Sequence, residues 1–94
     1  MVPSYSCGDE LEAVLRAGFN IIPYKIDSNL QADFDDIKSK ISKKTGLVLL
    51  THYLGLPQKK VFSIKKACED MNLFLIEDCA HVFGGTFKGK PLGT

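Results

Sequence analysis

Hydrophobic residues recur along this chain in two alternating patterns, one typical of helices and one typical of strands. Three segments carry apolar residues three and four positions apart, the spacing that places side chains on one face of a helix. They predict helices at residues 8–17, 34–44 and 61–71. Short apolar runs between them predict strands at residues 20–26, 47–51 and 73–76. This alternation is the βαβ pattern of a parallel sheet, so the sequence predicts an α/β fold.

The residues that flank the predicted helices supply start and stop signals. Ser6 and Asp9 have the spacing of a capping box, with Asp in place of the usual Glu. Gly18 lies where a glycine commonly follows the end of a helix. Asp33 is placed to cap the second helix. Cys68 falls on the apolar face of the third helix, so we expect it to be a buried small hydrophobic residue.

The predicted strands differ in how we expect them to be covered. Residues 47–51 and 73–76 are almost wholly apolar, as expected of strands that are buried on both faces. Pro23 indicates that residues 20–26 form an edge strand or an irregular one. The glycine-rich tail from Gly84 to Thr94 is predicted to form a turn-rich hairpin.

Polar residues follow both buried strands directly. His52 comes after residues 47–51, and Glu77 and Asp78 come after residues 73–76. In open parallel sheets, ligands bind beyond the carboxyl ends of the strands. Neighbouring strands are about 4.8 Å apart, so we expect the Cα atoms of His52 and Asp78 to lie within roughly 10 Å at one edge.

Several kinds of chemistry are open to these residues. A carboxylate directly after a buried strand needs a partner, and Asp78 could simply cap a helical turn that begins at Cys79. His52, Asp78 and His81 could together be metal ligands, although their spacing matches no metal motif. Cys79 beside His81 suggests a thiol nucleophile only weakly, because residues two apart on a helical turn do not face each other.

The composition narrows the function classes. The chain has 94 residues and a formal charge of +1, which fits a single domain and gives no electrostatic signal for nucleic acid or an anionic membrane. Its longest apolar runs are far shorter than the ~18 residues of a membrane span, and its start does not resemble a signal peptide. Three cysteines without CxxC spacing argue against a disulfide framework or a zinc site. We therefore expect a cytoplasmic protein.

Several motifs in order along the chain resemble one family, the DegT/DnrJ/EryC1/StrS aminotransferases. Residues 75–81 and 84–93 resemble its EDxA[HQ]…GxxYKGKxxG signature, in which EDxA corresponds to Glu77–Ala80. Four shorter stretches are also similar to family landmarks in the expected order: Val2-Pro3-Ser4-Tyr5-Ser6, Ile26-Asp27, Ile41-Ser42-Lys43-Lys44-Thr45 and Thr51-His52-Tyr53-Leu54-Gly55-Leu56-Pro57. The resemblance covers nearly the whole chain.

The resemblance implies a function for named residues. Members are pyridoxal 5′-phosphate enzymes of fold type I that mostly transfer an amino group from an amino acid to a nucleotide-linked keto-sugar. Asp78 matches the carboxylate that pairs with the pyridine nitrogen of the cofactor. His81 matches a position that lies against the cofactor near its ring oxygen. His52 is expected to support the site by packing and hydrogen bonding, without a catalytic role.

The resemblance also implies what this chain lacks. Residues 1–94 look like the middle of the large domain, an incomplete three-layer α/β/α unit with a mainly parallel sheet. The family's phosphate-binding segment lies upstream, and its Schiff-base lysine lies downstream. Lys88 and Lys90 match the KGK turn instead. We therefore expect no catalytic residue in this stretch, no activity from it alone, and a homodimer when the enzyme is intact.

Two competing hypotheses remain open at this stage. The same α/β unit could be a non-catalytic binding or interaction module that pairs with other chains through exposed sheet edges. Less favoured is a metal-dependent hydrolase that uses His52, Asp78 and His81.

Overall fold

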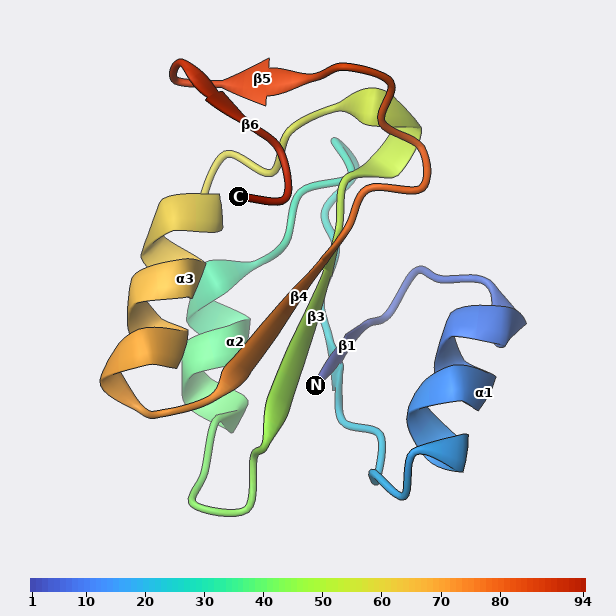
Figure 1. Ribbon diagram of the computed structural model, residues 1–94. Helices are drawn as coiled ribbons and strands as arrows, with labels where there is room; N and C mark the ends of the chain where they lie inside the picture. Colours follow the sequence, from blue (N-terminus) through green and yellow to red (C-terminus); the bar gives the residue numbers. More distant parts are fainter.

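Four short parallel strands form the middle layer of the fold. The computed structural model describes residues 1–94. Strand β1 (Val2–Pro3) pairs with β2 (Pro23–Tyr24), and β3 (Leu47–Thr51) pairs with β4 (Phe74–Asp78). The amide of Leu49 donates to the carbonyl of Met1 at 2.9 Å and joins the two pairs. These bonds place the strands in the order β2–β1–β3–β4, and β1, β3 and β4 can be followed side by side in Figure 1.

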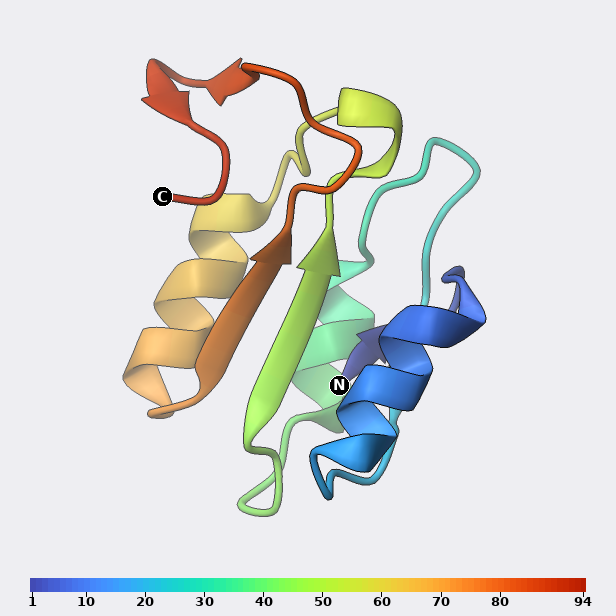
Figure 2. The ribbon, with the colours of Figure 1, turned by 45° about the vertical axis from the view of Figure 1, so that its right-hand side comes forward.

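Helices cover the two faces of this sheet unequally. Helices α2 (Phe34–Lys40) and α3 (Val61–Asp70) pack on one face, and α1 (Gly8–Arg16) lies alone on the other (Figure 2). The main core lies on the two-helix side and consists of Met1, Tyr24, Ala32, Ile37, Val48, Leu50, Val61, Ile64 and Cys68. The burial of Cys68 confirms its prediction, and the arrangement is the three-layer α/β/α unit that the resemblance implies.

Helix starts follow the sequence signals with one exception, but α2 ends at Lys40, four residues before the predicted end at residue 44, because the backbone is already extended at Ile41. The side chain of Asp33 accepts a hydrogen bond from the amide of Asp36 at 2.9 Å and caps α2, as predicted. Gly18 adopts φ +87° just after α1, which suits a glycine. The predicted capping box at Ser6 is wrong. Helix α1 begins at Gly8, as predicted, but its N-cap is Cys7 and no side chain caps it.

The strands are less buried at the edges than their apolar runs suggest. Of residues 20–26, only Pro23–Tyr24 form a strand, and it is the edge strand that Pro23 indicates. The expectation that residues 73–76 are buried on both faces is wrong. Strand β4 is the other edge of the sheet, and Phe74 and Ile76 are 75% and 50% exposed. On the face of the sheet where α1 lies, no element of the chain packs over β4.

The carboxyl ends of the strands lead into the segments above the sheet in Figure 1. A short 3-10 helix, η1 (Tyr53–Gly55), follows β3. The predicted hairpin is confirmed as β5 (Thr86–Phe87) paired antiparallel with β6 (Lys90–Pro91). Lys88 and Gly89 form its turn with positive φ angles of 50° and 77°.

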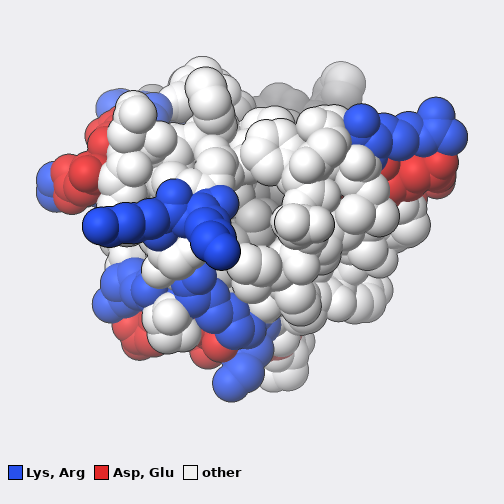
Figure 3. All heavy atoms as spheres, turned by 90° about the horizontal axis from the view of Figure 1, so that it is seen from below, with Lys and Arg blue, Asp and Glu red and all other residues white.

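At the end of the sheet where the strands begin, the middle of the surface carries no charged side chains (Figure 3). Viewed from this end, charged side chains gather on the side of α2 and α3 and at the outer side of α1 (Figure 3). Uncharged atoms cover the area between these two groups. None of the helices has the length and apolar character that crossing a membrane requires.

Candidate functional site at the carboxyl edge of the sheet

The ends of β3 and β4 meet at one edge, as the sequence predicts. Thr51 pairs with Asp78 in the parallel register. The amide of His52 donates to the carbonyl of Asp78 at 3.0 Å. The predicted juxtaposition of His52 and Asp78 is therefore confirmed at the level of the backbone.

Alternation along β4 sends its last two side chains to opposite faces of the sheet. Successive side chains of a strand point to opposite faces. Asp78 shares the α1 side with Ile76, and Glu77 lies on the α3 side with Leu75, which packs against the main core. His52 contacts Glu77 and so belongs to the α3 side as well. The side chains of Asp78 and His52 do not face each other.

Asp78 lies at the end of an apolar groove between α1 and the sheet. The groove has a volume of about 490 Å³. Its walls include Ala13 and Val14 of α1 and Leu49 and Ile76 of the sheet. A half-buried carboxylate at the end of an apolar groove favours a ligand with a flat apolar body and one polar or cationic group.

A local turn holds one oxygen of Asp78. Its Oδ1 accepts a hydrogen bond from the amide of Ala80 at 2.9 Å. A single turn begins at Cys79, where the amide of Val82 donates to the carbonyl of Cys79 at 2.8 Å, and Asp78 caps this turn as the alternative from the sequence anticipated. The bond from Ala80 restricts the rotation of the Asp78 side chain and leaves its second oxygen without a backbone partner.

Glu10 is a second carboxyl group in the same groove, and sequence reasoning missed it. It lies in the first turn of α1 and lines the groove together with Ala13, Val14 and Ala17. Burial raises the pKa of Glu10, and the carboxyl group of Asp78 raises it further, while His81 lowers it. The available signal was its helical spacing, because Glu10 precedes Val14 by four positions and so shares its face.

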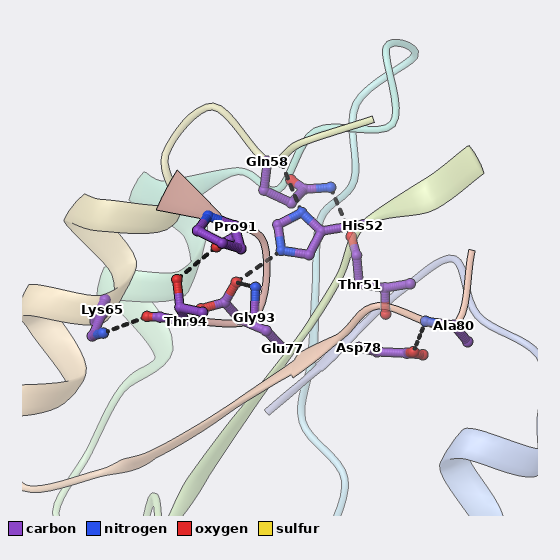
Figure 4. A network of polar contacts seen from close by, with 10 residues as sticks. All are labelled: Thr51, His52, Gln58, Lys65, Glu77, Asp78, Ala80, Pro91, Gly93 and Thr94. Atoms are coloured by element: carbon purple, nitrogen blue, oxygen red, sulfur yellow. Dashed lines mark hydrogen bonds and ion pairs between the residues drawn. The ribbon is translucent and has the colours of Figure 1, made fainter. Parts of the chain in front are cut away.

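On the other face, His52 and Glu77 belong to a buried network of polar contacts (Figure 4). The ring of His52 is fully buried. Its Nδ1 accepts from the amide of Gln58 at 3.1 Å. The proton of the neutral ring is therefore on Nε2, which donates to Glu77 Oε2 at 2.9 Å. The same oxygen accepts from the amide of Gly93 at 3.1 Å, which ties the end of the chain to β4.

Gln58 completes this network and was not singled out from the sequence. Its Nε2 donates to the carbonyls of Leu30 and Thr51, both at 2.8 Å. Its Oε1 accepts from the amide of Ala32 at 2.8 Å. One buried side chain therefore satisfies three backbone groups in two separate segments.

His81 lies in the turn after β4 and is exposed. Its Nδ1 accepts from the amide of Leu54 at 3.3 Å, which links the turn to η1. Gly55 lies close to this turn, since a Cβ there would be 3.2 Å from the carbonyl oxygen of His81, and its φ is +77°. A side chain at position 55 would push the two segments apart.

These contacts argue against the two other chemistries considered from the sequence. Both ring nitrogens of His52 are engaged with protein groups, and its ring lies on the opposite face from Asp78. No three His, Cys, Asp or Glu side chains converge as a metal site requires. Burial raises the pKa of Cys79, with Glu77 and Asp78 adding to the effect, so its reactive thiolate is disfavoured.

Comparison with known proteins identifies related enzymes. The chain is 39% identical over 97 residues to GDP-perosamine synthase from Escherichia coli O157:H7 and covers 26% of it. It is 32% identical over 95 residues to GDP-4-keto-6-deoxy-D-mannose 3-dehydratase from Yersinia pseudotuberculosis and covers 24% of it. Both matches span 100% of the chain, which is thus about a quarter as long as these relatives.

The fold of the chain matches that of a solved structure, and its sequence matches a family model. The crystal structure of 3-amino-5-hydroxybenzoic acid synthase superposes with a TM-score of 0.88 at 24% identity, over 98% of this chain and 24% of that one. The model of the DegT/DnrJ/EryC1/StrS aminotransferase family matches residues 1–94. The edge that presents Asp78, the fold and the full-length match agree, and this chain belongs to the DegT/DnrJ/EryC1/StrS aminotransferase family.

Proposed function

We propose that this chain forms part of the cofactor site of a pyridoxal 5′-phosphate enzyme that acts on a nucleotide-linked keto-sugar. The reaction that we propose is transfer of an amino group from an amino-acid donor to the sugar. The observation that carries the proposal is the carboxylate of Asp78, held by Ala80 at the end of an apolar groove. The names of both relatives refer to GDP-linked sugars, which supports the substrate class.

The residues around Asp78 fit a pyridine ring. The ring is flat and apolar on its faces, and the groove offers apolar walls from Ala13, Val14, Leu49 and Ile76. Its nitrogen needs an anionic partner to stay protonated, and the second oxygen of Asp78 has no backbone donor. When bound, the cofactor supplies an electron acceptor for the pair released as a substrate C–H bond breaks. Asp78 would keep the ring nitrogen protonated and orient the ring.

The two histidines have different places in this proposal. We propose that His81, which extends from the turn after β4, contacts the cofactor on the α1 side. His52 would act only through the backbone, because its ring faces Glu77 and Gln58 on the other side of the sheet. Its role is to fix the ends of β3 and β4 relative to each other.

The lysine that would bind the cofactor aldehyde is not among the groove residues. No lysine lines the groove beside Asp78. We therefore propose that the Schiff-base lysine lies outside these 94 residues and that no residue of this chain has that role. We also propose that the intact enzyme is a homodimer, which analytical ultracentrifugation would test.

Asp78→Asn tests the proposal in a full-length family protein that contains residues 1–94. The amide keeps the shape of the side chain but cannot hold the ring nitrogen protonated. Amino transfer is expected to fall by orders of magnitude, and cofactor affinity much less, because Asp78 would pair only with the ring nitrogen. Asp70→Asn, an exposed change at the end of α3, is the matched control. Near-normal turnover in the Asp78 variant would contradict the proposal.

A second candidate reaction is removal of water from the keto-sugar, since one relative is a 3-dehydratase. The same carboxylate would serve both reactions, so Asp78 does not distinguish them. Product analysis with and without an amino-acid donor separates the two. Incorporation of donor nitrogen into the sugar supports amino transfer, and a deoxygenated sugar formed without net incorporation supports dehydration. The absence of either product would favour a non-catalytic module.

A further inference from the structure

Glu10 and Asp78 bring two carboxyl groups together in one apolar groove. Glu10 extends from the first turn of α1 and Asp78 from the end of β4. Both line the groove, and the carboxyl group of Asp78 raises the pKa of Glu10. Two ionised carboxylates only accept hydrogen bonds, so contact between them requires a proton on one of them.

The polar atoms of the pair show where that proton belongs. Glu10 Oε2 is buried and has no hydrogen-bond partner. Asp78 Oδ1 already accepts from the amide of Ala80, so this carboxyl group has a partner that Glu10 lacks. A proton on Glu10 that is donated to Asp78 satisfies the unpartnered carboxyl group and keeps the negative charge on Asp78.

The groups around Glu10 also favour placing the proton on this residue. Burial raises the pKa of Glu10, and the hydrogen bond and charge of Asp78 act in the same direction. The titratable groups that face Glu10 are Asp78, His81 in the next turn, Tyr53 of η1 and Tyr24 of β2. Of these groups, His81 lowers the pKa of Glu10 when its imidazole is charged.

We propose that Glu10 is a positioning residue for Asp78 and holds one proton between the two carboxyl groups. The pair then carries a single negative charge. Ala80 and Glu10 together restrict the carboxylate of Asp78, so it presents one orientation to a protonated ring nitrogen in the groove. This last step rests on the proposed function, but the shared proton does not.

The proton has a defined effect on stability. The folded state raises the pKa of Glu10 above its unfolded value near 4.5. The folded chain therefore holds the proton more tightly, and the resulting stabilisation is present at low pH and lost as the pH rises through the folded pKa. Glu10→Gln removes this dependence because the amide does not titrate.

Carboxyl ¹³C NMR on the 94-residue chain tests the shared proton directly. In the wild-type chain, Glu10 is expected to retain its proton above the usual range for glutamate, in part because of Asp78. Asp78→Asn is expected to return Glu10 towards an ordinary single titration. Glu12→Gln, the same kind of change at an exposed position of α1, leaves the titration of Glu10 unchanged. A Glu10 carboxyl group that titrates identically in the wild-type chain and in Asp78→Asn would overturn the proposal.

Ligand binding tests the positioning role separately. The probe is pyridoxine 5′-phosphate, which lacks the aldehyde, and the host is a full-length family protein that contains residues 1–94. Its absorbance reports the protonation of the ring nitrogen. Glu10→Ala is expected to weaken binding severalfold and to lower the fraction with a protonated ring nitrogen. Glu10→Gln should restore both, because its amide still donates to Asp78.

The two possible failures are distinguishable. A Glu10 pKa that falls in Asp78→Asn, without any binding of the probe, would contradict the proposed function and support the shared proton. Binding that depends on Asp78 but is the same in wild type, Glu10→Ala and Glu10→Gln would overturn the positioning role and leave the proposed function intact.

Discussion

At the scale of single residues, Gln58 shows how one side chain can hold separate segments together. It is 1% exposed, and its amide group bonds to the backbone of Leu30, Ala32 and Thr51. These residues belong to the loop before α2 and to the end of β3. The carboxyl edge therefore depends on a polar side chain that a hydrophobic pattern cannot reveal.

Gln58→Ala is expected to destabilise the chain strongly. It leaves one amide and two carbonyls unpaired in a region with little solvent, and each unsatisfied group costs about 1–3 kcal/mol. We expect a loss of roughly 2–5 kcal/mol in the free energy of unfolding, measured by urea denaturation. Ser63→Ala on the exposed face of α3 is the control. A loss below about 1 kcal/mol in the Gln58 variant would mean that these groups find other partners.

At the scale of elements, α1 and α2 begin in different ways. Asp33 provides a side-chain acceptor for α2, and Cys7 provides none for α1. Helix α2 has only seven residues, so its first turn is a large part of it. Its stability should therefore depend on the cap.

Replacement of Asp33 separates the cap from the charge. Asp33→Ala removes the acceptor for the amide of Asp36 and should cost about 1 kcal/mol. Asp33→Asn keeps an acceptor and should cost much less, although it removes the same charge. Thermal unfolding of both variants tests this, and equal losses would assign the effect to charge instead of capping.

The sequence predicted elements well where one local rule decided the outcome. The spacing of Ile64 and Cys68 identified the buried face of α3, and Asp33 identified the start of α2. It failed for β4, because the exposure of Phe74 depends on which elements lie beside the strand, not on its own residues. The same limit applies to the site, where Asp78 followed from the strand end and Glu10 required knowing that α1 packs beside it.

At the scale of the whole molecule, the eleven lysines are distributed away from the groove. Most are exposed, and Lys40 and Lys65 bond to other parts of the chain. An exposed ammonium group with an ordinary pKa of ~10.4 is a poor amine nucleophile near neutral pH. No single lysine is placed to react with an aldehyde bound beside Asp78.

We therefore expect the isolated 94-residue chain to have no aminotransferase activity. Mixing it with pyridoxal phosphate, reducing with borohydride and mapping the adducts by mass spectrometry should show partial modification at several lysines. Asp78→Asn should leave the pattern unchanged. One dominant lysine modified stoichiometrically, together with measurable amino transfer, would contradict this expectation.

The joining of the two strand pairs through Met1 and Leu49 has a consequence for the order of folding. Strands β3 and β4 are linked directly by α3, so their pairing closes a short loop. Strand β1 reaches β3 only after α1, β2 and α2 have been made, and closing a longer loop costs more chain entropy. We expect the β3–α3–β4 unit to form first and to act as the template on which β1 and β2 assemble. The groove that contains Asp78 would then be completed last, when α1 is brought against a sheet that already exists.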